Sequence, residues 1–312
     1  MRRSRRGRET QMSSVTVMGL GPMGQAMTRT LRRAGTRVRA WNRSVEKAYA
    51  MREFGAIPAE SRAEAVDASA VIVVSLTHYA AMYDVLEPVA DRLAGKTIVN
   101  LSSDSPEVTR AAGAWIRERG GRFLAGGVMA DPAGVGGAEA TVFYSGSRAA
   151  FDACVDLLRP LGRPEYLGAN EGTAQLYYQA VLSMFLPGLL AFEQALAMIA
   201  GSGESIERFA PHARRAMAGM PDSYLALAAM AAEGGWRDTA HLRMMAAGAH
   251  HALDTATAAG VDATLAAAVA SYWDRALAAG DRAGEPVSTY QILRGEHPNA
   301  ARAANGSSAS AS

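Results

Sequence analysis

Residues 15–24 read Val-Thr-Val-Met-Gly-Leu-Gly-Pro-Met-Gly, a short apolar strand that runs into three glycines. A helix-like segment, residues 25–34, follows directly. Strand, Gly-x-Gly-x-x-Gly and helix in this order are the fingerprint of a dinucleotide-binding turn. Gly19 permits the tight turn, Gly21 lets the backbone approach a pyrophosphate, and Gly24 lets helix and strand pack closely. Because free N–H groups at a helix start face bound phosphates, the stretch predicts a nucleotide site rather than a purely structural turn.

A second strand, expected at residues 36–41, ends in Asn42-Arg43-Ser44. NAD-selective sites usually carry an acidic side chain here to hold the ribose 2′-OH, and Asn42 takes its place. A carboxylate would repel a 2′-phosphate, whereas the Arg43 guanidinium can bind one in bidentate geometry. Ser44 can cap the next helix and donate its hydroxyl to the same phosphate, with Lys47 one turn on. The pattern favours NADPH over NADH, the alternative being a solvated, charged turn. The expected cofactor contacts are Gly19, Leu20, Gly21, Pro22, Met23, Gly24, Asn42, Arg43, Ser44 and Lys47.

The composition is that of a soluble enzyme with a sizeable core. The chain has 312 residues, 49% of them hydrophobic and 20% charged, and we expect two domains. We find no uncharged run of about 18 apolar residues and therefore expect no contact with a membrane. The single cysteine, Cys154, excludes an internal disulfide and is typical of a reducing, cytoplasmic setting. We expect it to be a small core residue of a helix.

The positive charge of the chain is concentrated at its beginning. The net charge is +2, but the first eleven residues carry five arginines and one glutamate, which leaves −2 for the rest. We therefore expect no nucleic-acid partner for the folded part. Residues 1–13 are predicted to be a disordered basic arm that lacks the apolar region of a signal peptide. Residues 297–312, rich in Ala, Ser and Gly, are predicted to be a disordered tail.

Between these ends the chain changes character once. Over residues 14–169, β-rich bursts alternate with helical stretches, which predicts an α/β domain with a parallel, doubly wound Rossmann-type sheet. Residues 170–200 read as one interdomain helix about 45 Å long, in which Pro187 is a candidate kink. Residues 201–296 read as an all-α domain. The expected strands are 15–19, 38–41, 70–76, 97–101, 123–125 and 140–144, and the expected later helices are 206–220, 222–233, 239–259, 263–279 and 287–293.

The predicted interdomain helix is rich in Ala, Leu, Met and aromatic residues. Such a helix would expose a large apolar surface unless a partner covered it. Burial against a second subunit is the simplest cover, so we expect a homodimer.

At this point the chain resembles the imine reductases, within the β-hydroxyacid dehydrogenase and 6-phosphogluconate dehydrogenase-like superfamily, over about residues 14–295. The glycine motif is common to many families, but its combination with the segments after it is more specific. The resemblance implies NADPH as cofactor and dimers that swap their helical domains around the interdomain helix. Each active site would lie between the nucleotide domain of one subunit and the helices of the other. The matching segments are Gly19-Leu-Gly-Pro-Met-Gly24, Trp41-Asn-Arg-Ser44, Asn100-Leu-Ser-Ser-Asp-Ser-Pro106, Gly126-Gly-Val-Met-Ala-Asp-Pro132 and Tyr144-Ser-Gly146.

The start of the interdomain helix separates the related families. β-Hydroxyacid dehydrogenases carry a lysine there as general acid or base, and the matching position here is Gln175, which cannot exchange a proton. Tyr178, one turn on, occupies the position at which imine reductases carry Asp or Tyr. A lysine about 4 Å from a protonated imine would repel it by roughly 4 kcal/mol, enough to slow hydride transfer about a thousandfold. Gln175 with Tyr178 therefore favours reduction of a C=N bond.

The resemblance implies hydride transfer from the nicotinamide C4 of NADPH to the carbon of an imine or iminium substrate. Tyr178 would donate a proton to the nitrogen or orient it, since an unperturbed tyrosine has a pKa near 10 and both roles stay open. The alternative for Tyr178 is a packed helix tyrosine. Ser102 and Ser103 would lie near the nicotinamide, and Ser75, Leu76 and Thr77 are further expected cofactor contacts. The candidate pocket residues are Met129, Asp131, Gln175, Ser183, Trp236, His241 and Met245.

Three positions depart from the relatives that also condense ketones with amines. Those relatives tend to carry Asn at Ser103, Asp at Tyr178 and Tyr at Leu186, so we expect reduction of preformed, cyclic imines. Two other functions remain open: an NADP-dependent β-hydroxyacid or carbonyl oxidoreductase, and a non-catalytic NADPH-binding sensor or scaffold. We expect no metal, because His250 and His251 point about 100° apart on a helix and no third ligand completes a set.

Overall fold

The computed structural model describes residues 14–235 and 238–295. The chain divides into two compact units, and the boundary between Met184 and Phe185 lies inside the longest helix, α7 (Gly172–Gly201). We call the part up to Met184 the sheet unit and the part from Phe185 the helical unit. The predicted basic arm, the predicted C-terminal tail and Trp236 lie outside the described residues.

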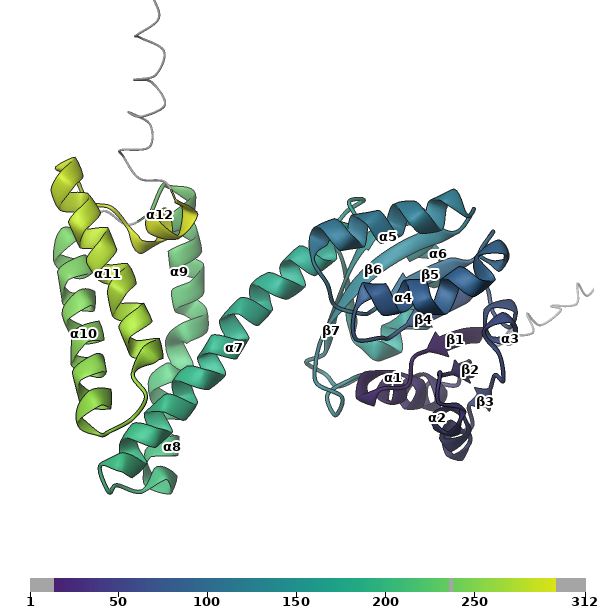
Figure 1. The fold of residues 1–312 in the computed structure, drawn as a ribbon, viewed down its shortest axis with the longest axis horizontal. Helices are drawn as coiled ribbons and strands as arrows, with labels where there is room; N and C mark the ends of the chain where they lie inside the picture. The colour runs from purple at the N-terminus through teal and green to yellow at the C-terminus, as the bar shows by residue number, and fades with distance from the viewer. Residues whose placement is uncertain (1–13, 236–237, 296–312) are drawn as a thin grey trace, which may run out of the picture. The chain divides into compact units, whose positions relative to one another are not determined.

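An eight-stranded sheet forms the centre of the sheet unit (Figure 1). Its strands are β1 (Ser14–Met18), β2 (Arg37–Trp41), β3 (Ile57–Pro58), β4 (Val71–Val74), β5 (Thr97–Asn100), β6 (Arg122–Met129), β7 (Thr141–Gly146) and β8 (Arg163–Tyr166). Their spatial order is β3-β2-β1-β4-β5-β6-β7-β8. The chain thus leaves β1 in one direction for β2 and β3, and returns to its other side with β4. Ligands bind at such a switch point, outside the carboxyl ends of the strands.

The sheet is mixed, so the expectation of a wholly parallel sheet was wrong at one pair of strands. β6 and β7 are antiparallel, with Gly126 opposite Tyr144, while the other neighbours are parallel. The segment between them, residues 130–140, contains no helix, and antiparallel strands need no crossover. The short strands β3 and β8 were not predicted. Both lie at sheet edges and contain a proline, which hides the sequence signal of a strand.

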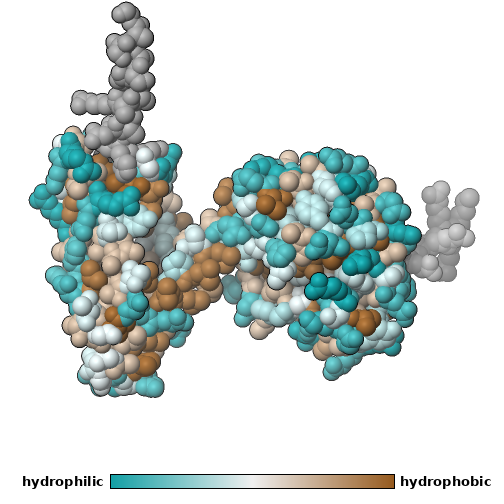
Figure 2. Space-filling view, in the orientation of Figure 1, coloured by the Kyte–Doolittle hydropathy of each residue, from teal (hydrophilic) through white to brown (hydrophobic). Residues whose placement is uncertain are grey.

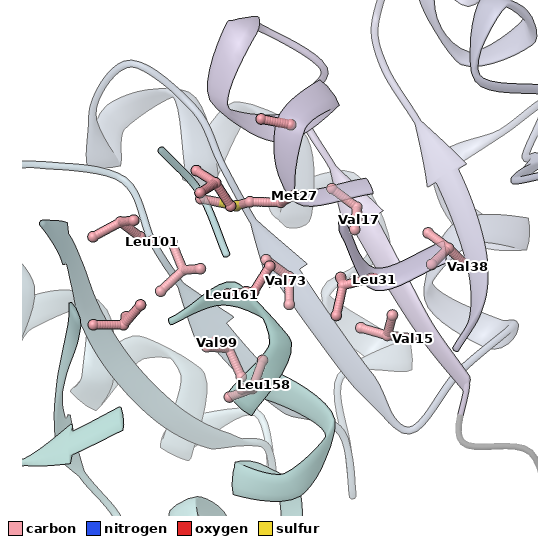
Figure 3. Close-up of a cluster of buried hydrophobic side chains, with 14 of the residues drawn as sticks. Val15, Val17, Met27, Leu31, Val38, Val73, Val99, Leu101, Leu158 and Leu161 are labelled. Atoms are coloured by element: carbon pink, nitrogen blue, oxygen red, sulfur yellow. The ribbon is translucent and has the colours of Figure 1, made fainter. Parts of the chain in front are cut away.

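Helices cover both faces of the sheet, because its central strands are apolar on both sides. Val15 and Val17 of β1 pack on one face with Met27 and Leu31, and Figure 3 shows this cluster. Met18 packs on the other face, with side chains of the helices there. The helices of the first face are α1 (Pro22–Arg33) and α6 (Arg148–Leu158), and those of the second are α3 (Arg62–Asp67), α4 (Tyr79–Leu86) and α5 (Pro106–Glu118). The sheet unit also has α2 (Val45–Ala50) and 3-10 helices at Met51–Phe54, Glu87–Arg92 and Arg159–Leu161.

The helical unit has very little buried apolar core of its own. One buried cluster joins the end of helix α11 (Thr264–Ala283) to the residues that follow it in the sequence and consists of Ala276, Ala279, Val287 and Ile292. The predicted helices of this region are present, with small differences at their ends. They are α8 (Ile206–Ala216), α9 (Met220–Ala232), α10 (Thr239–Ala258), α11 (Thr264–Ala283) and α12 (Thr289–Arg294), with a 3-10 turn at Met217–Gly219.

The long helix α7 continues through Pro187 and carries an exposed apolar surface, seen as the brown band along α7 in Figure 2. By length and composition alone it could cross a membrane, and none of its most apolar stretch is buried. The expectation that the sequence holds no such stretch was therefore wrong: Glu193 is the one charged residue of α7. An apolar helix that packs against another subunit has the same composition, so this finding alone does not indicate a membrane.

Candidate active site

The glycine turn after β1 is packed tightly on its inner side and open on its outer side. Gly19 has a φ of +97°, and a Cβ there would overlap the carbonyl oxygen of Ser75. A Cβ at Gly24 would overlap the carbonyl oxygen of Gly19. A Cβ at Gly21 would meet no atom within 4 Å. The turn therefore leaves its backbone accessible at Gly21, where the fingerprint places a pyrophosphate.

Asn42 connects this turn to the end of β2. Its Oδ1 accepts a hydrogen bond from the Leu20 N–H at 2.9 Å, and its Nδ2 donates to the Ser44 carbonyl at 3.1 Å. An aspartate could accept the first bond but could not donate the second. Asn42 thus holds the turn in place, and because it is neutral it would also not repel a 2′-phosphate.

The chain directly after Asn42 borders a hollow of about 430 Å³. Arg43 lines it and is exposed, as expected for a group that meets a phosphate. Ser44 stands at the N-cap position of α2, but its side chain makes no capping hydrogen bond, so the predicted cap is absent and the hydroxyl is free for a ligand. Lys47 is exposed on α2. The hollow is lined by Trp41, Asn42, Arg43, Val45, Glu60, Ser61, Arg62, Ala63, Pro88 and Val89.

A second hollow, of about 170 Å³, lies where the carboxyl ends of β4 and β5 meet β6. It brings together residues from five separate segments of the sequence, among them Ser102 and Ser103, which are predicted to lie near the nicotinamide. Tyr178 and Gln175 reach it from α7, and Met23 reaches it from the start of α1. Its lining is Met23, Ser75, Leu76, Thr77, Leu101, Ser102, Ser103, Gly126, Gly127, Val128, Ala130, Gln175 and Tyr178.

Gln175 is completely buried, and hydrogen bonds to backbone groups occupy its amide. Its Nε2 donates to the carbonyl oxygens of Ser102 and Gly126, both at 2.9 Å. Its Oε1 accepts from the Asp104 N–H at 3.4 Å. Gln175 therefore fastens α7 to the loop after β5 and to β6, and no polar group of its side chain is left for a substrate.

The two serines of the loop after β5 are also held by hydrogen bonds. The Oγ of Ser102 accepts from the Leu76 N–H at 3.0 Å, which ties this loop to the one after β4. The Oγ of Ser103 accepts from Nε2 of Gln179 at 2.8 Å, and the same amide donates to the Asp104 carbonyl at 3.2 Å. Sequence reasoning missed Gln179. Its position four residues after Gln175, on the same helix face, was the available signal.

Tyr178 is the polar side chain that α7 brings to the hollow and leaves free. It is half-buried, and its hydroxyl has no hydrogen-bond partner in the described parts of the chain. Burial raises the pKa of Tyr178 above its usual value. Its ring packs on the backbone of Gly127, where a Cβ would come within 3.0 Å of the ring. The phenol therefore stays protonated at neutral pH and is held in one place, ready to donate a hydrogen bond.

The remaining candidate pocket residues lie away from this hollow or in the helical unit. Asp131 is exposed and its Oδ1 accepts from the Gly134 N–H at 2.7 Å, so it shapes its own loop. Met129 ends β6 without lining the hollow, and Ser183 is exposed and donates to the Ala180 carbonyl at 2.7 Å. Two others, His241 and Met245, are exposed residues of α10.

No group of three His, Cys, Asp or Glu residues that could hold a metal ion occurs within residues 14–235 and 238–295. His250 instead lies 3.0 Å from an Oδ1 of Asp274, between α10 and α11.

Two family models together match nearly the whole described chain. One, described as the NAD binding domain of 6-phosphogluconate dehydrogenase, matches residues 14–174. The other, described as NADPH-dependent reductive aminase-like, C-terminal domain, matches residues 170–295. A curated relative, the NADPH-dependent reductive aminase of Aspergillus oryzae, is 33% identical over 186 residues. This match covers 59% of the chain and 63% of the relative, which is less than two thirds of the relative's length.

Solved structures match over a larger share of the chain. An imine reductase from Bacillus cereus BAG3X2 gives a TM-score of 0.79 at 37% identity, covering 90% of this chain and 99% of that one. An imine reductase from Aspergillus terreus, in complex with NADPH4 and a dibenzazepine, gives 0.81 at 29% identity, covering 91% and 100%. The predicted fold class and family resemblance are confirmed. The chain belongs to the imine reductase family, with a nucleotide-binding domain of the 6-phosphogluconate dehydrogenase type.

Proposed function

We propose that this protein reduces the C=N bond of preformed, cyclic imines or iminium ions with NADPH, and that Tyr178 holds the substrate nitrogen. One observation carries the proposal. The only free polar side chain that α7 brings to the hollow within the described residues is the Tyr178 phenol, while the place of the dehydrogenase lysine is taken by the neutral, fully bonded Gln175. A cationic substrate therefore meets no positive charge from α7 at this place.

The cofactor fits the sheet unit at two places. The open backbone at Gly21 suits a pyrophosphate, and the hollow beside Arg43 suits a phosphorylated ribose. When bound, NADPH supplies the hydride that converts the C=N carbon into an amine carbon. Ser102 and Ser103 belong to the loop that borders the second hollow. Gln175 and Gln179 attach that loop to α7 by hydrogen bonds. The reducing cofactor and the substrate nitrogen would thus be positioned by segments that are hydrogen-bonded to each other.

The role of Tyr178 follows from its protonation state. Because burial raises its pKa, the phenol is neutral throughout the physiological range and can donate a hydrogen bond to an imine nitrogen. With a substrate that arrives unprotonated, the same group can deliver the proton in the transition state. With an iminium ion, the phenol oxygen accepts the N–H and orients the carbon.

The test is NADPH consumption with 2-methylpyrroline, run beside NADP+ reduction with a panel of small β-hydroxyacids. We expect turnover of the imine and none of the hydroxyacids. Tyr178→Phe should lower kcat about a hundredfold, the size of a positioned proton donor. Tyr177→Phe is the matched control: Tyr177 is exposed and its ring packs edge-on against Phe143, 5.9 Å away. Turnover of hydroxyacids alone would reassign the activity, and NADPH binding without turnover would indicate a sensor or scaffold.

We propose further that the protein functions as a homodimer built on α7 and the helical unit. α7 exposes nine large apolar side chains, and the helical unit holds an apolar hollow of about 730 Å³ between α7 and α8–α9. Exposed apolar surface of this extent is typical of a subunit interface. The side chains on α7 are Leu176, Tyr177, Val181, Met184, Phe185, Leu186, Leu189, Leu190 and Phe192.

Light scattering after size exclusion tests the dimer directly. A mass of twice 32.8 kDa that persists on dilution is expected. A stable monomer in detergent-free buffer would contradict the dimer, and a protein that stays in solution only with detergent would favour a membrane as the cover of α7.

A further inference from the structure

Arg62 lies in the same hollow as Arg43, although nothing in the local sequence links the two residues. It is the first residue of α3, and its Cζ lies 5.4 Å from the centre of the Trp41 ring, in cation–π contact. The Trp41 side chain is only 6% exposed and forms a fixed platform. The Nε of Arg62 is buried and has no hydrogen-bond partner in the described chain.

The acids around this hollow are bonded elsewhere. Glu64 pairs with Arg39 at 2.8 Å, and Glu60, which lines the hollow, accepts a hydrogen bond from the Tyr49 hydroxyl at 3.0 Å. Neither Arg43 nor Arg62 forms an ion pair within residues 14–235 and 238–295. Two guanidinium groups thus share one hollow, and neither is paired with a carboxylate of the described residues. They repel each other unless an anion enters, and a phosphate dianion is the anion that two guanidinium forks fit best.

We infer that Arg62 is a second determinant of NADPH specificity, which binds the 2′-phosphate together with Arg43 while it rests on Trp41. The inference depends on the proposed use of NADPH. It adds a residue 19 positions beyond Arg43, from a different element. Since the amide of Asn42 is bonded to Leu20 and Ser44, the arginine pair would add two bidentate contacts to the extra phosphate, beside those expected from Ser44 and Lys47.

The Trp41 platform gives the arrangement its physical advantage. An arginine on a flexible surface loses side-chain entropy when it binds, whereas a guanidinium already stacked on a buried ring has lost part of that freedom beforehand. Lysine could supply the charge but not the planar, bidentate fork. The fork should therefore matter as well as the charge.

The experiment compares two fragments of the cofactor that differ only in the 2′-phosphate. Adenosine 2′,5′-bisphosphate and 5′-AMP are titrated by calorimetry into the wild type, Arg62→Gln, Arg62→Lys and Arg92→Gln. Arg92 is the matched control, because it pairs with Asp67 at the end of the same helix, α3, and lies outside the hollow. We expect Arg62→Gln to weaken the bisphosphate about tenfold or more and to leave 5′-AMP within about twofold. Arg62→Lys should lose less, and Arg92→Gln should lose nothing.

Each other result overturns the inference. An equal loss for both fragments would mean that Arg62 stacks on the adenine, and an unchanged affinity for the bisphosphate would mean that Arg62 only packs on Trp41. A wild type that binds both fragments equally would contradict the proposed preference for NADPH itself. This result differs from the ones that contradict only the role of Arg62, so the two proposals can be told apart. If Arg62→Gln does not fold, Arg62→Lys carries the same comparison, with the ratio of the two dissociation constants as its readout.

Discussion

The sheet unit and the helical unit bury their apolar residues in opposite ways. The sheet unit encloses two apolar clusters, one on each face of the sheet, and before α7 exposes only Val45, Tyr49 and Val108 among the large apolar side chains of its described residues. The helical unit has one cluster of four small and branched residues and exposes a long series of large side chains. Apart from those on α7, these are Ile206, Met217, Met220, Tyr224, Leu225, Leu227, Met230, Met244, Met245, Val269, Tyr272 and Leu293.

This difference indicates which steps of the function depend on the sheet unit alone and which depend on assembly. The glycine turn, the hollow beside Arg43 and the hollow beside Tyr178 are all built from residues 14–184, so we expect cofactor binding to need nothing from the helical unit. The helical unit lacks the core that would stabilise it alone. We expect it to obtain its stability from a second copy, and turnover to depend on that assembly.

The largest effect is expected from a substitution on α7 that should abolish dimerisation and turnover but leave the binding of NADPH unchanged. Leu186 on α7 is 58% exposed, and Val108 on α5 is 36% exposed. In a dimer, Leu186→Asp would bury a charge in each subunit, at a cost of several kcal/mol, and the protein should become monomeric and lose turnover. Val108→Asp should leave the mass and the rate unchanged. NADPH affinity, measured by fluorescence, should stay within about twofold in both variants, because the sites are independent. A Leu186→Asp dimer with full activity would contradict the comparison.

The sequence predicted features that depend on neighbouring residues and missed those that depend on distant ones. The glycine turn, Asn42-Arg43-Ser44 and the length of α7 are local patterns and were foreseen. The hydrogen bonds of Gln175 join it to residues 49 to 73 positions away, and the stacking of Arg62 on Trp41 joins two elements, so neither had a local signal. The cap predicted for Ser44 is absent. A residue type allows such a bond, but only the packed neighbours decide whether it forms.

A second prediction concerns the attachment of α7 to the sheet unit. Gln175→Leu removes three hydrogen bonds and leaves buried carbonyls of Ser102 and Gly126 without their donor. The free energy of unfolding should fall by about 2–5 kcal/mol, measured by urea titration. Gln179→Leu is the matched variant, since Gln179 is only partly buried, and it should cost about 1 kcal/mol. Equal losses for the two variants would mean that Gln175 is not the main attachment.

A third prediction uses alkaline pH, to which the sheet unit should respond alone. Burial raises the pKa of Tyr79, Tyr144 and Tyr178, all of which belong to it. In the unfolded chain these tyrosines ionise near pH 10, whereas the folded sheet unit resists ionisation. The unfolded state thus binds fewer protons above pH 10, and stability should be flat below pH 10 and fall above it. Tyrosinate absorbance that rises only together with loss of near-UV circular dichroism would support this, and full ionisation in the folded protein would contradict it.

The smallest expected effect concerns the pH dependence of the rate, to which Tyr178 should contribute no titration. Since the pKa of Tyr178 is raised rather than lowered, its phenol should not titrate between pH 6 and 9. Any decline of kcat/KM over that range should then follow the protonation of the substrate imine and move when a more basic imine is used. Tyr178→Phe should lower the whole profile without shifting its midpoint. A midpoint that stays fixed across imines of different basicity, and disappears in Tyr178→Phe, would mean that Tyr178 titrates in this range and that another group lowers its pKa in the assembled enzyme. Such a group would have to come from outside the sheet unit, and the separation of cofactor binding from assembly would then not extend to proton transfer.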